Sequence, residues 1–154
     1  KSESLPSDTD LLVVAGGFSY GDYLRSGAIA KFSPVMKAVT TYANNGGKVL
    51  GICNGFQVLT EAGLLPGALK RNDGLHFISK HHTLKVINND NIFLEKLDNG
   101  DVVNIPIAHH DGNYFIDSDG LKNLEENNQI LLKYTDKNGN IQNPNGSVES
   151  IAGV

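Results

Sequence analysis

The sequence predicts an α/β protein, because two apolar strands are each followed by a helical segment. Residues Leu11 to Ala15 are continuously apolar and stop at a glycine pair, as in a strand buried on both faces of a parallel sheet. Residues 48–52 predict a second strand of the same kind. The order strand, helix, strand, helix implies helices layered on a sheet.

Apolar residues at three- and four-residue steps predict the two helices. The first begins near Ala28, with Ser26 as a possible N-cap and Gly46 as its stop. Its apolar positions are Ile29, Phe32, Val35, Met36, Val39 and Tyr42. The second carries Phe56, Leu59 and Ala62 and closes near Gly63.

Beyond Gly67 the pattern changes to shorter segments between turn-rich runs. Residues 83–87, 102–107 and 129–134 predict strands with hairpin-like connections. A short helix is expected over about 121–126, capped by Ser118 or Asp119. The Asn- and Gly-rich run 137–147 is expected to be a long loop.

Length and composition indicate one globular domain over residues 1–154. A net charge of −4 without a dense Lys or Arg run argues against nucleic acid and anionic lipid as partners. The apolar stretch at 11–15 is far below the roughly 20 residues that span a bilayer. A lone cysteine gives no sign of an oxidising compartment, so the cytoplasm is expected.

The two ends favour a partial chain. A polar run leads straight into a strand of central character, and the sequence halts at the apolar segment Ile151 to Val154. We therefore expect a domain that is incomplete at both ends.

Cys53 is the candidate nucleophile. It lies between a buried strand and a helix, with Gly51 and Gly55 two positions away on either side. A sharp strand-to-helix turn lifts such a side chain out of the sheet, and only glycine avoids collisions at the flanking positions. The start of the following helix also lowers a thiol pKa and offers N–H groups to an oxyanion.

Other interpretations remain open at this level. A single cysteine is most often a packing residue, and elbows of this shape occur in unrelated hydrolases. The glycine loop 16–22 is either a tight turn or a loop whose N–H groups face a substrate carbonyl, since nucleotide-binding spacings are not matched. The five histidines lack metal-ligand spacing, so no metal is expected.

Four motifs occur in succession across nearly the whole chain. They are the run Gly16 to Arg25, the run Gly51 to Gln57, Gly63-Leu64-Leu65-Pro66-Gly67, and Ile105-Pro106-Ile107-Ala108-His109. Asn145-Gly146-Ser147 and Ile151-Ala152-Gly153 follow near the end. In order and spacing these motifs resemble one family, the glutaminase subunit of phosphoribosylformylglycinamidine synthase, a class I glutamine amidotransferase.

The resemblance implies a flavodoxin-like α/β fold with a mostly parallel central sheet and helices on both faces. It implies hydrolysis of the L-glutamine amide through a thioester on Cys53, with N–H groups of Gly17 and Asn54 as the oxyanion hole. Gln57 would hold the amino-acid end of the substrate. The segment Gly112, Asn113 and Tyr114 would border the pocket.

By the same resemblance, ammonia would pass to a synthetase subunit that makes formylglycinamidine ribonucleotide in purine biosynthesis, with a small third subunit in the complex. ATP and Mg²⁺ would belong to the synthetase, and this subunit would need no cofactor. The family's catalytic His and Glu fall after Val154. The alternatives are an inactive scaffold or regulatory subunit of the same fold, and a hydrolase unrelated to glutamine.

Overall fold

The computed structural model describes residues 3–154. These residues divide into two compact units, the first ending at Ala68 and the second spanning Leu69–Val154. Each unit is described by itself, and the expectation of a single domain over 1–154 stays a prediction. No helix in the described part is long and apolar enough to cross a membrane.

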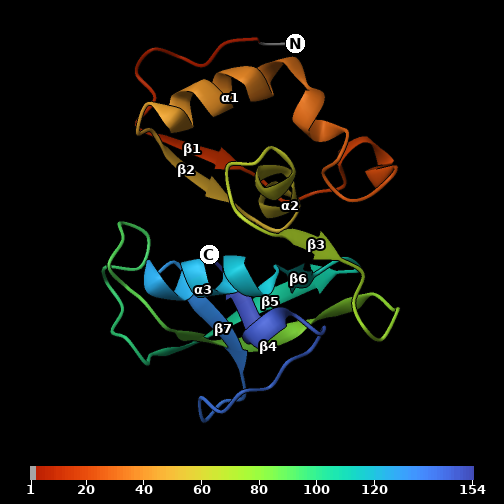
Figure 1. Cartoon of the computed structure of the whole chain (residues 1–154), viewed down its shortest axis with the longest axis vertical. Helices are drawn as coiled ribbons and strands as arrows, with labels where there is room; N and C mark the ends of the chain where they lie inside the picture. Colours follow the sequence, from red (N-terminus) through yellow and green to blue (C-terminus); the bar gives the residue numbers. More distant parts are fainter. Residues whose placement is uncertain (1–2) are drawn as a thin grey trace. The chain divides into compact units, whose positions relative to one another are not determined.

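The first unit is built on two parallel strands. β1 (Leu11–Val14) pairs with β2 (Lys48–Gly51), and the register runs from Leu11 opposite Lys48 to Val14 opposite Gly51 (Figure 1). Two helices, α1 (Pro34–Asn44) and α2 (Asn54–Glu61), contribute to one apolar cluster with β1. That cluster comprises Ala30, Met36, Val39 and Val58, packed against partly buried side chains that include Leu12 and Val14. The predicted strand-helix-strand-helix order is confirmed.

One face of this strand pair is open in the described chain. Leu12 and Val14 pack on the apolar cluster, whereas Leu11 and Val13 are 47% and 48% exposed. Successive side chains of a strand point to opposite faces, so the helices of this unit cover one face. The expectation that this strand is buried on both faces is therefore wrong for residues 3–154.

The first helix begins later than its apolar spacing indicates. Residues Ala30–Phe32 form a separate 3₁₀ turn, and α1 starts at Pro34 with Ser33 as the N-cap position, so the expected cap at Ser26 is wrong. The residue before a proline avoids the helical region, and Ser33 is extended at φ −63° and ψ 142°. Proline is itself favoured at the first helical position.

The second unit is dominated by antiparallel pairing. β4 (Ile78–Val86) pairs with β5 (Val102–His109) and β7 (Leu132–Thr135), and β7 pairs with β8 (Ile151–Gly153). β3 (Ala68–Lys70) and β6 (Asn113–Phe115) form a separate two-stranded sheet. Leu84, Ile107 and Tyr134 form the buried centre of the four-stranded sheet. The three predicted strands are confirmed, with shifted ends. The hairpin-like connection is confirmed between β4 and β5 but is wrong for β5 and β7, because β6 lies between them along the chain and β7 pairs with β4.

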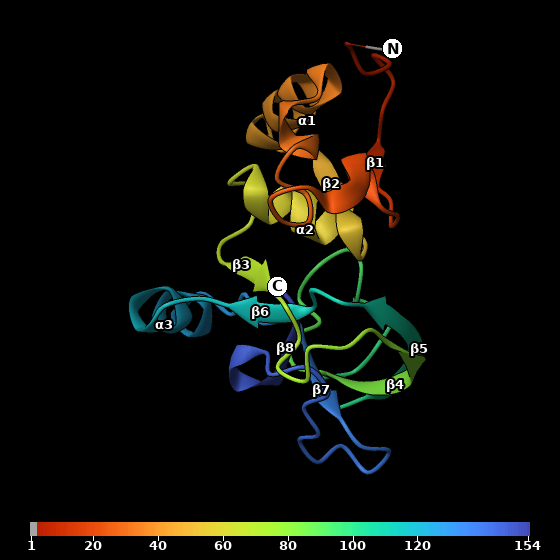
Figure 2. The ribbon, with the colours of Figure 1, turned by 90° about the vertical axis from the view of Figure 1, so that its right-hand side faces the viewer.

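Short elements account for the remaining differences in this unit. β3 and β6 have three residues each, too few to give a periodic signal, and were not predicted. α3 (Ser118–Glu126), which follows β6 in Figure 2, is longer than predicted. Its N-cap is Asp117, whose side chain accepts a hydrogen bond from Gly120 N at 2.7 Å, so the expected caps Ser118 and Asp119 are wrong. Val148–Ser150 is a 3₁₀ segment of this unit, and Ser19–Asp22 and Ala30–Phe32 are the 3₁₀ segments of the first unit.

Helix α2 approaches the strands so closely that two of its contacts require glycine. A Cβ atom on Gly55 would lie 1.8 Å from the carbonyl oxygen of Val14 in β1. A Cβ on Gly51 would lie 2.6 Å from Leu59 Cδ1 and 3.0 Å from the Gly55 backbone. The glycines at both sides of Cys53 are therefore steric requirements, as the sequence predicted.

Gly55→Ala is expected to destabilise the protein by about 3 kcal/mol or more, because the added methyl group can be accommodated only by moving α2 off β1. Urea unfolding followed by circular dichroism measures this loss. Gly153→Ala is the matched control, since a Cβ there meets Leu132 only at 3.5 Å or more, and its effect should stay within about 0.5 kcal/mol. A Gly55→Ala protein as stable as the parent would show that this contact is not tight.

Candidate active site

Cys53 lies at the turn between β2 and α2. It occupies the N-cap position of α2 with φ 54° and ψ −109°, and its side chain is exposed. A positive φ on a residue other than glycine is strained by about 1–3 kcal/mol, and such strain clusters at functional sites. The local structure thus presents a thiol on a sharp turn at the positive end of a helix.

The glycine loop after β1 lies beside this cysteine. A Cβ on Gly16 would be 3.4 Å from Cys53 Cβ, and Gly17 follows with φ 154° and open space where a Cβ would lie. Asn54 is the first residue of α2, where a backbone N–H has no acceptor within the helix. Two N–H groups on adjoining segments are the elements of an oxyanion hole.

The side chain of Asn54 is the centre of a polar cluster in the same unit. It is 2% exposed, and its Nδ2 donates to Gln57 Oε1 at 2.8 Å and to Asp22 Oδ1 at 3.4 Å. Its Oδ1 accepts a hydrogen bond from Ser19 Oγ. Gln57 is 8% exposed, with its amide oxygen turned toward Asn54. Ser19 and Asp22 were not predicted as site residues, although both lie in the glycine loop 16–22.

The chain just after the glycine loop is hydrogen-bonded to the C-terminal end of α2. Arg25 donates from Nη2 to Glu61 Oε2 at 2.9 Å and from Nε to Oε1, and Lys31 Nζ lies 3.7 Å from the same carboxylate. Hydrogen bonding to Glu61 raises the pKa of Arg25. The forked geometry fixes the direction in which the chain leaves the loop.

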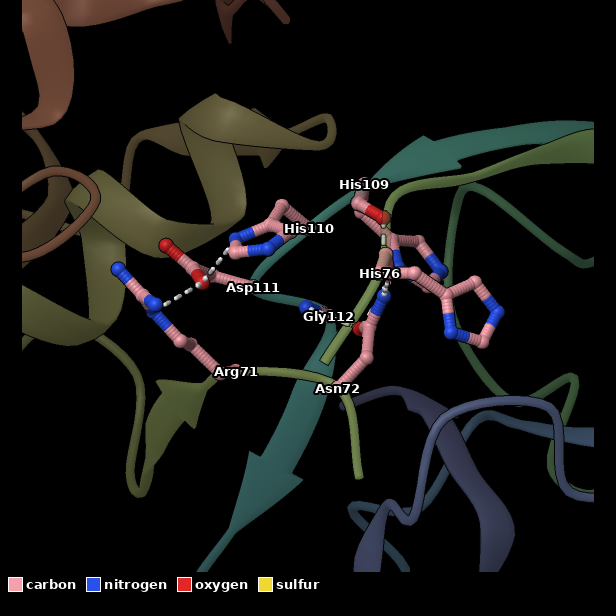
Figure 3. A network of polar contacts seen from close by, with 7 residues as sticks. All are labelled: Arg71, Asn72, His76, His109, His110, Asp111 and Gly112. Atoms are coloured by element: carbon pink, nitrogen blue, oxygen red, sulfur yellow. Dashed lines mark hydrogen bonds and ion pairs between the residues drawn. The ribbon is translucent and has the colours of Figure 1, made fainter. Parts of the chain in front are cut away.

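The expected pocket segment Gly112, Asn113 and Tyr114 lies in the second unit at the start of β6. Asn113 and Tyr114 are buried, and burial raises the pKa of Tyr114 to about 12. Gly112 donates its N–H to Asn72 Oδ1 at 3.0 Å, and its carbonyl accepts from Asn145 Nδ2 at 2.8 Å (Figure 3 draws the Asn72 side). The backbone of Gly112 is therefore held from both sides.

Asn72 is completely buried and uses its whole side-chain amide. Nδ2 donates to the carbonyls of His76 and His109, both at 2.9 Å, and Oδ1 accepts from Gly112 N and faces His109 Nδ1 at 3.0 Å (Figure 3). Asn145 Nδ2 lies 3.5 Å from the other ring nitrogen, Nε2. These contacts favour a neutral His109 with its proton on Nδ1, and burial lowers its pKa.

The structure thus gathers Cys53, Asn54, Gln57 and the Gly16-Gly17 loop in one unit, and holds the 112–114 segment in the other. The roles of Gly17, Asn54 and Gln57, and of the 112–114 segment, stay predictions. Residues 3–154 contain no group of three or more His, Cys, Asp or Glu side chains arranged to hold a metal ion. The expected absence of a metal likewise stays a prediction.

Known proteins provide a comparison for the whole chain. The family model described as the CobB/CobQ-like glutamine amidotransferase domain matches residues 2–154. Phosphoribosylformylglycinamidine synthase subunit PurQ of Sulfurimonas denitrificans is 80% identical over 154 residues, which are 100% of this chain and 69% of that relative. The chain belongs to the PurQ family of glutamine amidotransferases.

Further PurQ relatives extend the comparison. The PurQ subunit of Wolinella succinogenes is 62% identical over 154 residues, which are 100% of this chain and 68% of the relative. The solved structure of PurLQS from Thermotoga maritima matches with a TM-score of 0.82 and 40% identity, over 96% of this chain and 63% of that one. The chain thus spans about two thirds of the length of these PurQ relatives. The resemblance drawn from the motifs is confirmed, as is the amidotransferase α/β fold.

The strained backbone at Cys53 leads to a stability prediction. Cys53→Gly is expected to be more stable than Cys53→Ala by about 1 kcal/mol, because glycine adopts a positive φ without steric cost. Urea unfolding of both variants measures the difference. Lys37, exposed in the regular helix α1, gives the matched control, where glycine should instead be about 1 kcal/mol worse than alanine. If the glycine and alanine variants had the same order of stability at positions 53 and 37, backbone strain at Cys53 would be contradicted.

His109 leads to a pH prediction. Its pKa in the folded protein is lowered from the ordinary 6.5, chiefly by burial, so the unfolded chain takes up the proton first as pH falls. The stability tied to neutral His109 is therefore fully present above pH 6.5 and is lost as pH falls through the folded pKa. Between pH 7.5 and pH 5.5 the midpoint of unfolding should fall by more in the parent than in the His109→Gln variant. His81→Gln, at an exposed site, is the control and should behave as the parent.

Proposed function

We propose that this chain is the glutamine-hydrolysing part of phosphoribosylformylglycinamidine synthase and that Cys53 is its nucleophile. The observation that carries the proposal is the placement of Cys53 at a strained strand-to-helix turn, beside the Gly16-Gly17 loop, in a chain that is 80% identical to a PurQ subunit. A thiol in this position gains nucleophilicity from the helix start.

The proposed reaction has two steps at the amide carbon of L-glutamine. The Cys53 thiolate attacks this carbon, the tetrahedral oxyanion collapses, the C–N bond breaks, and ammonia leaves after taking a proton, so a thioester forms. Water then attacks the thioester and releases glutamate and the thiol. The resemblance puts the His that carries these protons, and its orienting Glu, after residue 154 in the longer relatives.

Within this proposal, the residues around Cys53 have separate tasks. The N–H groups of Gly17 and Asn54 stabilise the oxyanion, since one comes from the adjoining loop and the other from the first turn of α2. Gln57 holds the amino-acid end of glutamine. The segment Gly112, Asn113 and Tyr114 borders the pocket, and the Asn72 and Asn145 contacts give its backbone one conformation.

The proposal includes partners that use the ammonia. The solved relative is the structure of PurLQS from Thermotoga maritima, which supports a synthetase subunit and a small third subunit as partners of this chain too. ATP and Mg²⁺ would act in the synthetase, and this subunit needs no cofactor of its own. We further propose a cytoplasmic location, and a mostly parallel central sheet with helices on both faces, of which β1 and β2 are two members.

Active-site labelling with 6-diazo-5-oxo-norleucine, a glutamine analogue that alkylates amidotransferase cysteines, tests the proposal on the full-length protein with its synthetase partner. Intact-mass spectrometry should show one adduct, peptide mapping should place it on Cys53, and L-glutamine should slow its formation. Cys53→Ala should take up no label and release no ammonia from glutamine. A full-length protein that stays unlabelled in the complex would instead support the inactive scaffold.

A further inference from the structure

We propose that Ser19 is a positioning residue that, together with Asp22, fastens the glycine loop of residues 16–22 to the first residue of α2. The fastening holds the Gly17 and Asn54 N–H groups in a single arrangement around the oxyanion. This inference rests on the proposed function, because it concerns how the same hydrolytic site is kept ready for reaction.

The contacts that carry the inference meet at the Asn54 side chain. Ser19 Oγ donates to Asn54 Oδ1, while Asn54 Nδ2 donates to Asp22 Oδ1 at 3.4 Å and to Gln57 Oε1 at 2.8 Å. An ionised carboxylate can only accept, so the Asp22 contact requires the nitrogen, Nδ2, of the Asn54 amide to face Asp22. The oxygen is then left for the Ser19 hydroxyl, and the two loop contacts are mutually consistent.

Apolar packing contributes little to the shape of this loop. Tyr20, Gly21 and Asp22 all have positive φ, at 53°, 68° and 49°. Of the apolar side chains around them, Phe18 is 74% exposed and Leu24 is 89% exposed. Because burial of these side chains contributes little, the polar contacts to Asn54 carry much of the stabilisation of this segment.

These contacts would act on the chemistry through geometry. Gly17 lies two residues before Ser19, and Asn54 supplies both the side chain that receives the Ser19 hydrogen bond and the second oxyanion N–H. Loss of the Ser19 hydroxyl removes one of the two loop contacts to Asn54. It also leaves the buried Asn54 Oδ1 without this donor. Misplaced donors weaken the transition state more than substrate binding, so kcat should change rather than KM.

Ser19→Ala in the full-length protein, assembled with its synthetase partner, tests the inference. The glutaminase kcat should fall roughly 10- to 100-fold, while KM for glutamine changes less than about threefold. Ser19→Thr keeps the hydroxyl and should restore most of the activity. Synthesis driven by added ammonia should be unaffected, because it does not use this site.

Two further measurements separate positioning from a general structural role. Alkylation of Cys53 by iodoacetamide forms no oxyanion, so its rate should be the same in Ser19→Ala and the parent. In an Asn54→Ala background the acceptor of the Ser19 hydrogen bond is already gone, so adding Ser19→Ala should lower kcat little further. Ser33→Ala is the matched control, since the Ser33 side chain makes no capping bond to α1, and it should retain parental kinetics.

The outcomes distinguish the inference from the function on which it rests. An unchanged kcat in Ser19→Ala, a loss confined to KM, or an equal loss in the iodoacetamide rate would each overturn the positioning role while leaving a working glutaminase. Failure of the parent complex to hydrolyse glutamine would instead overturn the proposed function.

Discussion

The close approach of α2 to β1 is the constraint on which the first unit depends. With Gly55 pressed against the Val14 carbonyl, only Ile52 and Cys53 separate β2 from α2, so the chain must turn within these two residues. The positive φ of Cys53 is the local consequence of that short connection. Burial of Val58 in the cluster shared with α1 opposes the strain, so the reactive thiol stays exposed on an element fixed by packing.

In the second unit, buried hydrogen bonds fix the backbone near the start of β6. Asn72 and Asn145 connect the end of β5, the Gly112 turn and the loop near residue 145 through hydrogen bonds in which the Asn72 amide is fully used. A buried amide costs little when all its groups are paired and much when one is left over. Such a network specifies one backbone conformation where the segment between β5 and β6 has little apolar material.

Much of the fold and of the candidate site could be predicted because the signals were local. The apolar runs gave β1 and β2, and Gly51 and Gly55 gave the turn at Cys53, since each reflects contacts within a few residues. The start of α1 was misjudged because apolar spacing continued through Phe32 and outweighed the effect of Pro34 on Ser33. The role of Asn72 was beyond prediction, since the partners His109 and Gly112 lie 37 and 40 residues further along the chain.

The tight seating of α2 also protects the chemical integrity of the chain. Asn54 and Gly55 form an Asn-Gly dipeptide, in which attack of the glycine nitrogen on the asparagine side chain starts deamidation in flexible peptides. Here the Gly55 N–H donates to the Ile52 carbonyl at 2.8 Å, and Asn54 is fixed in a helical turn with its amide engaged by neighbouring groups. That attack is disfavoured while α2 is folded. The packing that exposes the Cys53 thiol therefore also slows deamidation of Asn54.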